Sequence, residues 1–160
     1  MNMKKKILYI DMDGVIADFD EGIALICKNS KTLPDFKTWD SKVDYICANY
    51  PDFFYNIPPI TGAIDAINYL IQQYEVYFLS TPMWDVPNSY IGKRIWIEKH
   101  FPVEGKKRLI LTHRKDLQIG EYLIDDRLKN GAENFTGIHI HFGTKEFTNW
   151  EAVLTFLQIK

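Results

Sequence analysis

The sequence has few cysteines and no long hydrophobic run. Cys27 and Cys47 are its only cysteines, and they lack the Cys-x-x-Cys spacing of redox motifs. Two cysteines cannot form a disulfide framework, so we expect reduced, half-buried thiols without a chemical role. The lysine-rich start precedes a short apolar run at residues 7–10, which suits neither a signal-peptide core nor a membrane span. These absences predict a cytoplasmic protein that does not cross a membrane.

The sequence also lacks a basic excess, internal repeats and low-complexity segments. Its 160 residues carry a formal net charge of −2, so no basic field is present to hold duplex nucleic acid or an anionic membrane. A local phosphate pocket remains compatible with this charge, because it needs only one or two cations. A hydrophobic content of 46% excludes a mainly disordered protein. We therefore expect one globular domain with a full core and room for a small insert.

The apolar run at residues 7–10 ends in two carboxylates and a glycine. Consecutive apolar residues are typical of a strand that is buried on both faces. Asp11 and Asp13 follow this run closely, and Gly14 permits a tight exit from the strand. The two charges repel each other, so a hard cation must neutralise them or one acid must hold a proton that it can donate. Asp-x-Asp-Gly also occurs at solvated turns, whereas a helix-loop-helix calcium site places its glycine later.

Four further strands are predicted, and they alternate with helical patterns. The strands are expected at residues 76–79, 108–112, 121–125 and 137–143, and the helices between and after them at 62–74, 88–97 and 150–157. This alternation predicts an α/β protein with a parallel sheet and helices on both faces. Such sheets bind ligands at the carboxyl ends of their strands.

Polar side chains follow the second and fourth predicted strands as well as the first. Ser80 and Thr81 end the second strand, and Asp125 and Asp126 end the fourth. Serine and threonine at a strand end also commonly satisfy local backbone groups. Together with Lys93, these side chains provide carboxylates for a hard cation and hydroxyl and ammonium groups for anionic oxygens. This set of groups indicates phosphoryl transfer with Mg²⁺.

Residues 18–59 form a longer, aromatic-rich segment between the first strand and the next core helix. A helix is expected on each side of the break at Leu33-Pro34-Asp35, and the prolines within 50–59 predict an irregular return path. We therefore predict a core domain of residues 1–17 and 60–160, and a small helical cap of residues 18–59 above the acidic strand end. The cap aromatics either form its own core or stack on a planar ligand such as a nucleobase.

The order of these motifs resembles that of the haloacid dehalogenase-like (HAD) hydrolases and, more narrowly, the 5′(3′)-deoxyribonucleotidases. The segments that carry the resemblance are Asp11-Met-Asp13-Gly-Val-Ile-Ala-Asp18-Phe19, Leu79-Ser80-Thr81-Pro82, Lys93 and Leu123-Ile124-Asp125-Asp126-Arg127. The resemblance implies a Rossmann-like five-stranded parallel sheet of order 5-4-1-2-3 with a small helical cap inserted after strand 1. It also implies a Mg²⁺-dependent phosphatase that hydrolyses (deoxy)ribonucleoside monophosphates.

The resemblance further implies a role for each matching acid. Asp11 is expected to be the nucleophile that forms an aspartyl-phosphate, and Asp13 the acid that protonates the leaving oxygen and later activates water. Mg²⁺ is expected on the Asp11 carboxylate, the Asp13 backbone carbonyl and Asp126, with Asp125 supporting these ligands from behind.

The phosphate and nucleoside sites are implied in the same way. Ser80, Thr81 and Lys93 are expected to hold the phosphate. The family tends to place an arginine soon after the third strand, where this chain has His113, Arg114 and Lys115 in succession. The candidates for the substrate pocket are Phe19, Trp39 and Arg114.

Three other interpretations remain open. The same chemistry serves other small phosphomonoesters. A receiver-type phosphoacceptor domain also has clustered acids on a parallel sheet, but its acceptor aspartate follows the third strand, where this chain has Thr112 and His113. His139 and His141, on one face of the fifth strand, either present two imidazoles to a metal or are ordinary histidines of an edge strand.

Overall fold

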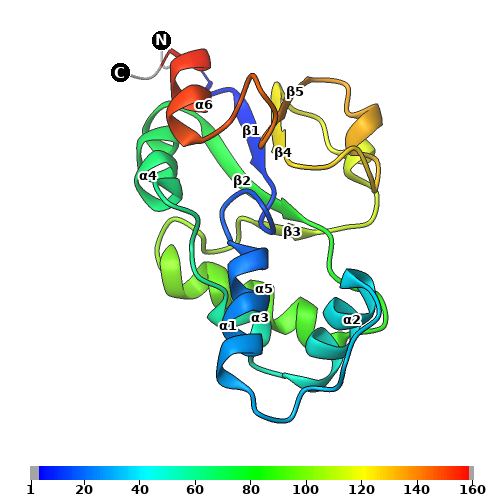
Figure 1. Cartoon of the computed structure of the whole chain (residues 1–160). Helices are drawn as coiled ribbons and strands as arrows, with labels where there is room; N and C mark the ends of the chain where they lie inside the picture. The colour runs from blue at the N-terminus through cyan, green and yellow to red at the C-terminus, as the bar shows by residue number, and fades with distance from the viewer. Residues whose placement is uncertain (1–3, 159–160) are drawn as a thin grey trace.

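The computed structural model describes residues 4–158, which form a parallel five-stranded sheet with a group of helices beyond one end of it (Figure 1). The strands are β1 (Ile7–Ile10), β2 (Glu75–Ser80), β3 (Leu109–Leu111), β4 (Tyr122–Asp125) and β5 (Ile138–His141). Their order is β3-β2-β1-β4-β5, which is the predicted order read from the other edge. The predicted α/β class and strand order are therefore confirmed.

The register of the three central strands determines where the polar residues emerge. Ile10 at the end of β1 lies beside Phe78 on β2 and Ile124 on β4. Parallel strands end at the same edge of a sheet, so the residues that follow β1, β2 and β4 are neighbours there. Asp11 and Asp125 therefore meet although they are far apart in the sequence.

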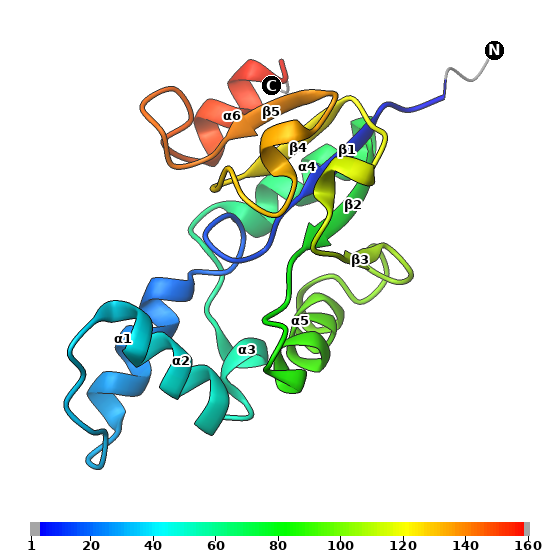
Figure 2. The same cartoon turned by 90° about the vertical axis from the view of Figure 1, so that its right-hand side faces the viewer.

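The two faces of the sheet are covered differently (Figure 2). Helices α4 (Ala63–Gln73) and α6 (Trp150–Phe156) contribute to the main hydrophobic core on one face. The opposite face carries a smaller cluster, which includes residues of the 3₁₀ turn η2 (Ala132–Asn134). The prediction of helices on both faces is wrong here, because the β3–β4 and β4–β5 connections hold only the turns η1 (Lys115–Leu117) and η2 and are too short for a full crossover helix.

Helices α1 (Phe19–Asn29), α2 (Trp39–Asn49) and α3 (Phe53–Asn56) lie together beyond the carboxyl end of the sheet (Figures 1 and 2). Local capping explains where the first two begin. The Asp18 carboxylate accepts a hydrogen bond from the backbone at the start of α1, and Thr38 forms a capping box at the start of α2. These caps satisfy amide groups that a helix start leaves unpaired.

Helix α3 corrects the prediction of an irregular path through residues 50–59. The prolines stand at positions 51, 58 and 59, so they flank the short helix and leave its backbone intact. Phe53 and Phe54 within it are 3% and 2% exposed. Burial of these two aromatic side chains favours a turn of helix, although the prolines in the sequence predicted an irregular path.

Helix α5 (Pro87–His100) connects the sheet to α3. It begins at Pro87, with proline in its first turn, and extends beyond the predicted range of 88–97 at both ends. Its Gly92 allows close contact with Phe54, because a Cβ there would collide with that side chain. The Trp96 indole donates a 2.8 Å hydrogen bond to the Ile57 carbonyl. Helix α5 packs both on the sheet and on α3, so the predicted division into a core domain and a cap of residues 18–59 stays a prediction. Residues 1–3 and 159–160 of the predicted core domain lie outside the described chain.

The loop after β1 is held by the last helix. Gly14 adopts a positive φ of 78°, which lets the chain turn sharply away from the sheet. The backbone N–H groups of Val15, Ile16 and Ala17 all converge on the Met12 carbonyl. The Trp150 indole on α6 donates a 2.9 Å hydrogen bond to the Val15 carbonyl. The turn that carries Asp11 and Asp13 is thus fixed from two sides.

Both cysteines are free thiols. Burial raises the pKa of the Cys47 thiol to about 12, so this group stays protonated at neutral pH. Within residues 4–158, no helix has both the length and the apolar character needed to traverse a bilayer.

Candidate active site

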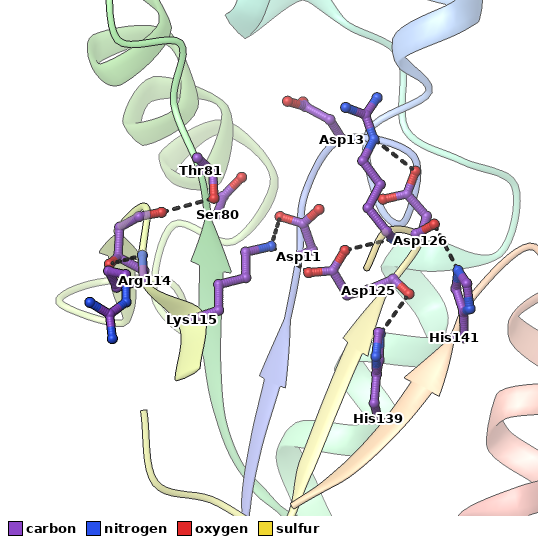
Figure 3. Close-up of polar contacts among 12 residues, drawn as sticks. Asp11, Asp13, Ser80, Thr81, Arg114, Lys115, Asp125, Asp126, His139 and His141 are labelled. Atoms are coloured by element: carbon purple, nitrogen blue, oxygen red, sulfur yellow. Dashed lines mark hydrogen bonds and ion pairs between the residues drawn. The ribbon is translucent and has the colours of Figure 1, made fainter. Parts of the chain in front are cut away.

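The carboxyl ends of β1, β2 and β4 open into a pocket of about 400 Å³, part of which Figure 3 shows. The core lines it with Asp11, Asp13, Ser80, Thr81, Met83, Lys115, Asp125, Arg127, Lys129 and Asn130. Helices α1, α2 and α3 line it with Phe19, Asp20, Trp39, Asp40, Val43 and Phe54. The structure therefore brings seven sequence-predicted site residues into one cavity, namely Asp11, Asp13, Phe19, Trp39, Ser80, Thr81 and Asp125.

A cluster of three carboxylates consists of Asp11 and Asp125, which line this pocket, and their neighbour Asp126, which is not among its lining residues. Asp11, Asp125 and Asp126 each offer an oxygen atom, and these atoms lie within 4.8 Å of one another. Burial, and then the charge of Asp11, raises the pKa of Asp126 to about 7 and that of Asp125 to about 6. Ionising Asp125 and Asp126 next to Asp11 is therefore costly unless a further cation binds there. Their oxygen donors match the preference of Mg²⁺.

Asp125 and Asp126 differ in how their oxygens are used. One Asp125 oxygen accepts a 2.5 Å hydrogen bond from the Lys115 ammonium, and the other accepts a 2.9 Å bond from the Arg127 backbone N–H. By contrast, Asp126 Oδ1 is buried and has no hydrogen-bond partner among the described residues. An orphaned buried carboxylate oxygen is costly unless it binds a ligand. The residues thus fit a metal held by Asp126 and supported by Asp125.

Gly14 provides the space that Asp126 occupies. A Cβ on Gly14 would collide with the Asp126 carboxylate, and the positive φ at this position also disfavours other residues. The Asp-x-Asp-Gly motif therefore contributes two carboxylates and the space for a third, that of Asp126, which follows β4 and is far away in the sequence.

Two buried lysines each form an ion pair with one carboxylate of the Asp-x-Asp-Gly motif. The Lys93 ammonium lies 2.5 Å from Asp13 Oδ2 and 3.0 Å from Ser80 Oγ. The Lys115 ammonium lies 3.0 Å from Asp11 Oδ1, in addition to its bond with Asp125 (Figure 3). Burial alone would lower the pKa of Lys115, but the charges of Asp11 and Asp125 outweigh it and raise the pKa. Lys115 therefore stays a cation beside Asp11.

The sequence did not single out Lys115 from its neighbours. Arg114, which was predicted for the substrate pocket, is absent from the pocket lining, and its guanidinium pairs with Asp116 at 2.6 Å. Lys115 begins η1, and its backbone N–H donates to the Asn130 carbonyl. This contact turns the segment so that Lys115 points inward. The only sequence signal was a run of three cations after the third strand.

The hydroxyls after β2 are placed differently from each other. Ser80 Oγ accepts a hydrogen bond from Lys93, so its own hydrogen remains available to a ligand. The Thr81 hydroxyl donates a 2.8 Å hydrogen bond to the Thr112 carbonyl and so secures the neighbouring strand end. A phosphate-binding role for both residues stays a prediction.

The aromatic residues of the pocket fall into two groups. Phe19 packs edge-on against Phe53, with ring centroids 5.2 Å apart, and so belongs to the packing of α1 and α3 as well as to the pocket. Trp39 lines the pocket while 48% of it is exposed. Trp39 is therefore the aromatic surface that is most open to a ligand.

The fold and site define a class of protein. A parallel β3-β2-β1-β4-β5 sheet with acids at the ends of β1 and β4 is the architecture of a HAD-type hydrolase. The protein YfnB from Bacillus subtilis, assigned as a HAD hydrolase and solved with bound magnesium, has this fold: the TM-score is 0.63 at 16% identity, over 98% of this chain and 100% of that one.

Sequence comparison identifies the family. The family described as "5' nucleotidase, deoxy (Pyrimidine), cytosolic type C protein" matches residues 5–153, and the chain belongs to it. A Vibrio phage KVP40 protein assigned as a 5'(3')-deoxyribonucleotidase is 44% identical over 96% of this chain and 85% of its own. The mitochondrial 5'(3')-deoxyribonucleotidase of Mus musculus is 26% identical over 91% of this chain and 70% of its own. The protein is thus a phosphoric monoester hydrolase of the HAD type.

Proposed function

We propose that the protein is a Mg²⁺-dependent phosphatase that hydrolyses nucleoside monophosphates, deoxyribonucleotides above all, through an aspartyl-phosphate on Asp11. The observation that carries the proposal is the meeting of Asp11, Asp125 and Asp126, the first two of which line a pocket together with Ser80 and an exposed tryptophan. Relatives named as deoxyribonucleotidases support the substrate class.

The metal would be held by the Asp11 carboxylate, the Asp13 backbone carbonyl and the free oxygen of Asp126. When bound, it supplies positive charge to the phosphate oxygens. Asp125, whose two oxygens are bonded to Lys115 and Arg127, keeps Lys115 next to Asp11. Lys115 therefore neutralises the Asp11 carboxylate from one side, while Asp11 also faces the pocket.

In the first step, an oxygen of Asp11 attacks the phosphorus and the bond from phosphorus to the sugar oxygen breaks. Asp13 donates its proton to that leaving oxygen, and the nucleoside departs. Asp13 suits this role because 23% of its side chain is exposed to the pocket, whereas its partner Lys93 is buried. Ser80 and Lys93 bind the phosphate oxygens during the transfer.

In the second step, Asp13 is a carboxylate and removes a proton from water. The resulting hydroxide attacks the aspartyl-phosphate, the bond from phosphorus to the Asp11 oxygen breaks, and inorganic phosphate leaves. The Lys93 ammonium, 2.5 Å from Asp13 Oδ2, holds the Asp13 side chain in place for this step. Both aspartates then return to their starting states.

Release of inorganic phosphate from a substrate panel tests the proposal. The panel contains 5′ and 3′ deoxyribonucleoside and ribonucleoside monophosphates together with sugar phosphates, each assayed with MgCl₂ and with EDTA. We expect turnover of nucleotides only with Mg²⁺, and faster turnover of nucleotides than of sugar phosphates. Faster hydrolysis of sugar phosphates would assign the same chemistry to another phosphomonoester. A single phosphorylation without turnover would indicate a receiver-type domain.

Asp11→Asn tests the nucleophile. We expect turnover to fall by a factor of at least about 10³, because an amide cannot form the covalent intermediate. Asp65→Asn is the matched control, since Asp65 is an exposed acid on α4. Thermal unfolding should be cooperative in both variants. Undiminished turnover by a folded Asp11→Asn protein would refute an aspartyl-phosphate on this residue.

A further inference from the structure

Two histidines of the edge strand β5 contact the backbone of the acidic pair (Figure 3). His139 Nε2 lies 3.2 Å from the Asp125 carbonyl oxygen, and His141 Nε2 lies 3.0 Å from the Asp126 carbonyl oxygen. Because a carbonyl oxygen only accepts hydrogen bonds, both rings must carry a hydrogen on Nε2. The two rings stack with centroids 5.4 Å apart. The two histidines thus donate hydrogen bonds to two consecutive backbone carbonyls.

The peptide of Asp126 depends on this contact more than that of Asp125. The Asp125 carbonyl also accepts a 3.0 Å hydrogen bond from the backbone N–H of Phe142, as part of the sheet. Strand β4 ends at Asp125, so Asp126 lies beyond the ladder that fixes the strand. Among the described residues, the His141 ring is the hydrogen-bond partner found for the Asp126 carbonyl.

Packing alone does not explain these two residues. His139 lies beside Leu123, which belongs to the small apolar cluster on that face of the sheet. Ile140 between the histidines points to the opposite face and is fully buried in the main core. An apolar residue would extend the small cluster equally well. Imidazole adds a rigid N–H donor at the place where each backbone carbonyl needs one.

We propose that His139 and His141 are positioning residues for the divalent-metal site, because they orient the peptides that carry Asp125 and Asp126. The inference rests on the proposed Mg²⁺-dependent function. With its peptide fixed, Asp126 directs its free oxygen toward Asp11 before the metal arrives. Without the donors, the segment must be ordered when the metal binds, and the metal affinity falls.

Mn²⁺ binding to the purified protein, followed by electron paramagnetic resonance without substrate, tests this role. For His141→Phe we expect the Mn²⁺ dissociation constant to rise about fivefold, as the loss of one neutral hydrogen bond implies. For the double variant His139→Phe/His141→Phe we expect a rise of about 10- to 100-fold. His141→Gln should recover most of the affinity, because its amide N–H can replace the imidazole donor.

His100→Phe is the control, because His100 packs against Trp96 on α5, with the two rings tilted by 40°, and its Nε2 has no partner among residues 4–158. It should bind Mn²⁺ as the wild type does. If the wild type binds Mn²⁺ and the Phe variants bind it equally well, the positioning role is wrong while the proposed function stands. Equal losses in the Phe and Gln variants would also overturn the role. If the wild type binds no Mn²⁺, the proposed function fails and this inference fails with it.

Discussion

The two sides of the pocket differ in how firmly their residues are held. On the sheet side, Asp11, Lys93, Lys115 and Asp125 are at most 7% exposed, and each forms an ion pair. On the helical side, Asp20, Trp39 and Asp40 are exposed. Side chains that are buried and paired have fixed positions before a ligand arrives, whereas exposed side chains can change conformation when it binds. From this difference we propose that the sheet side carries out the reaction and that exposed side chains of α1 and α2 contact the substrate.

On the sheet side, the buried residues are held in place because positive and negative side chains contact each other. Burying one carboxylate or one ammonium alone is strongly unfavourable, but each buried lysine here lies between an acid and a second polar partner. Removing one member would leave its partner uncompensated. Substitutions of the buried, paired residues on the sheet side should therefore affect stability and activity together, while those of the exposed Asp20, Trp39 and Asp40 should affect substrate binding alone.

Gly14→Ala should have the largest effect of three substitutions that compare the two sides, because it disturbs the sheet side directly. The positive φ costs about 1–2 kcal/mol of stability for a residue with a Cβ, and the Cβ displaces the Asp126 carboxylate. We expect kcat/KM to fall on the order of 100-fold. Gly143→Ala is the matched control, since its φ of 81° is similar but no atom lies within 4 Å of its Cβ. Equal loss of activity in both variants would show that the collision with Asp126 is unimportant.

Asp126→Asn should stabilise the metal-free protein at alkaline pH. The folded-state pKa of Asp126 is about 7, against 3.8 for an ordinary aspartate, so the folded state binds more protons and the wild type loses stability as pH rises from about 4 to about 7. The amide cannot ionise. We expect the variant to exceed the wild type by about 2 kcal/mol at pH 8 in EDTA, and to match it below pH 4.

Urea unfolding in EDTA and in MgCl₂ measures this difference. Mg²⁺ should stabilise the wild type at pH 8 and have little effect on Asp126→Asn, because the metal binds through the ionised carboxylate. A wild type that gains stability between pH 4 and pH 7 in EDTA would contradict the cost assigned to this acid.

Trp39→Ala should have the smallest effect, confined to substrate binding. Loss of a stacking surface is expected to raise KM for a deoxyribonucleotide about tenfold with kcat nearly unchanged. Because Trp39 is 48% exposed, the free energy of unfolding should change by less than about 0.5 kcal/mol. Tyr69→Ala, an exposed aromatic on α4, should change neither value. A large fall in kcat would show that the helical side also takes part in the reaction.

The sequence predicts the sheet side better than the rest because its signals are local. An apolar run that ends in acids identifies a buried strand and its tip, and the alternation of strands and helices then predicts a parallel sheet, whereas the strand order was implied by the resemblance to the HAD hydrolases. Trp39 is also within reach of sequence analysis, since an aromatic residue inserted after an acidic strand end suggests a ligand surface.

Lys115 and the short helix α3 depend on tertiary contacts that no local pattern encodes. Lys115 turns inward because its backbone N–H bonds to Asn130, which lies after the next strand. Helix α3 forms because Phe53 and Phe54 are buried against other elements. The roles of His139 and His141 were equally hidden, since their partners are carbonyl groups and carry no residue identity.

The hydrogen bond from Trp150 to the Val15 carbonyl joins residues 135 positions apart, one on the last helix and one in the turn beside the nucleophile. An indole in this position is a built-in optical reporter. Once its emission is separated from that of the other three tryptophans by substituting them, it should respond to changes in the shape of the turn that carries Asp11 and Asp13, without an attached dye.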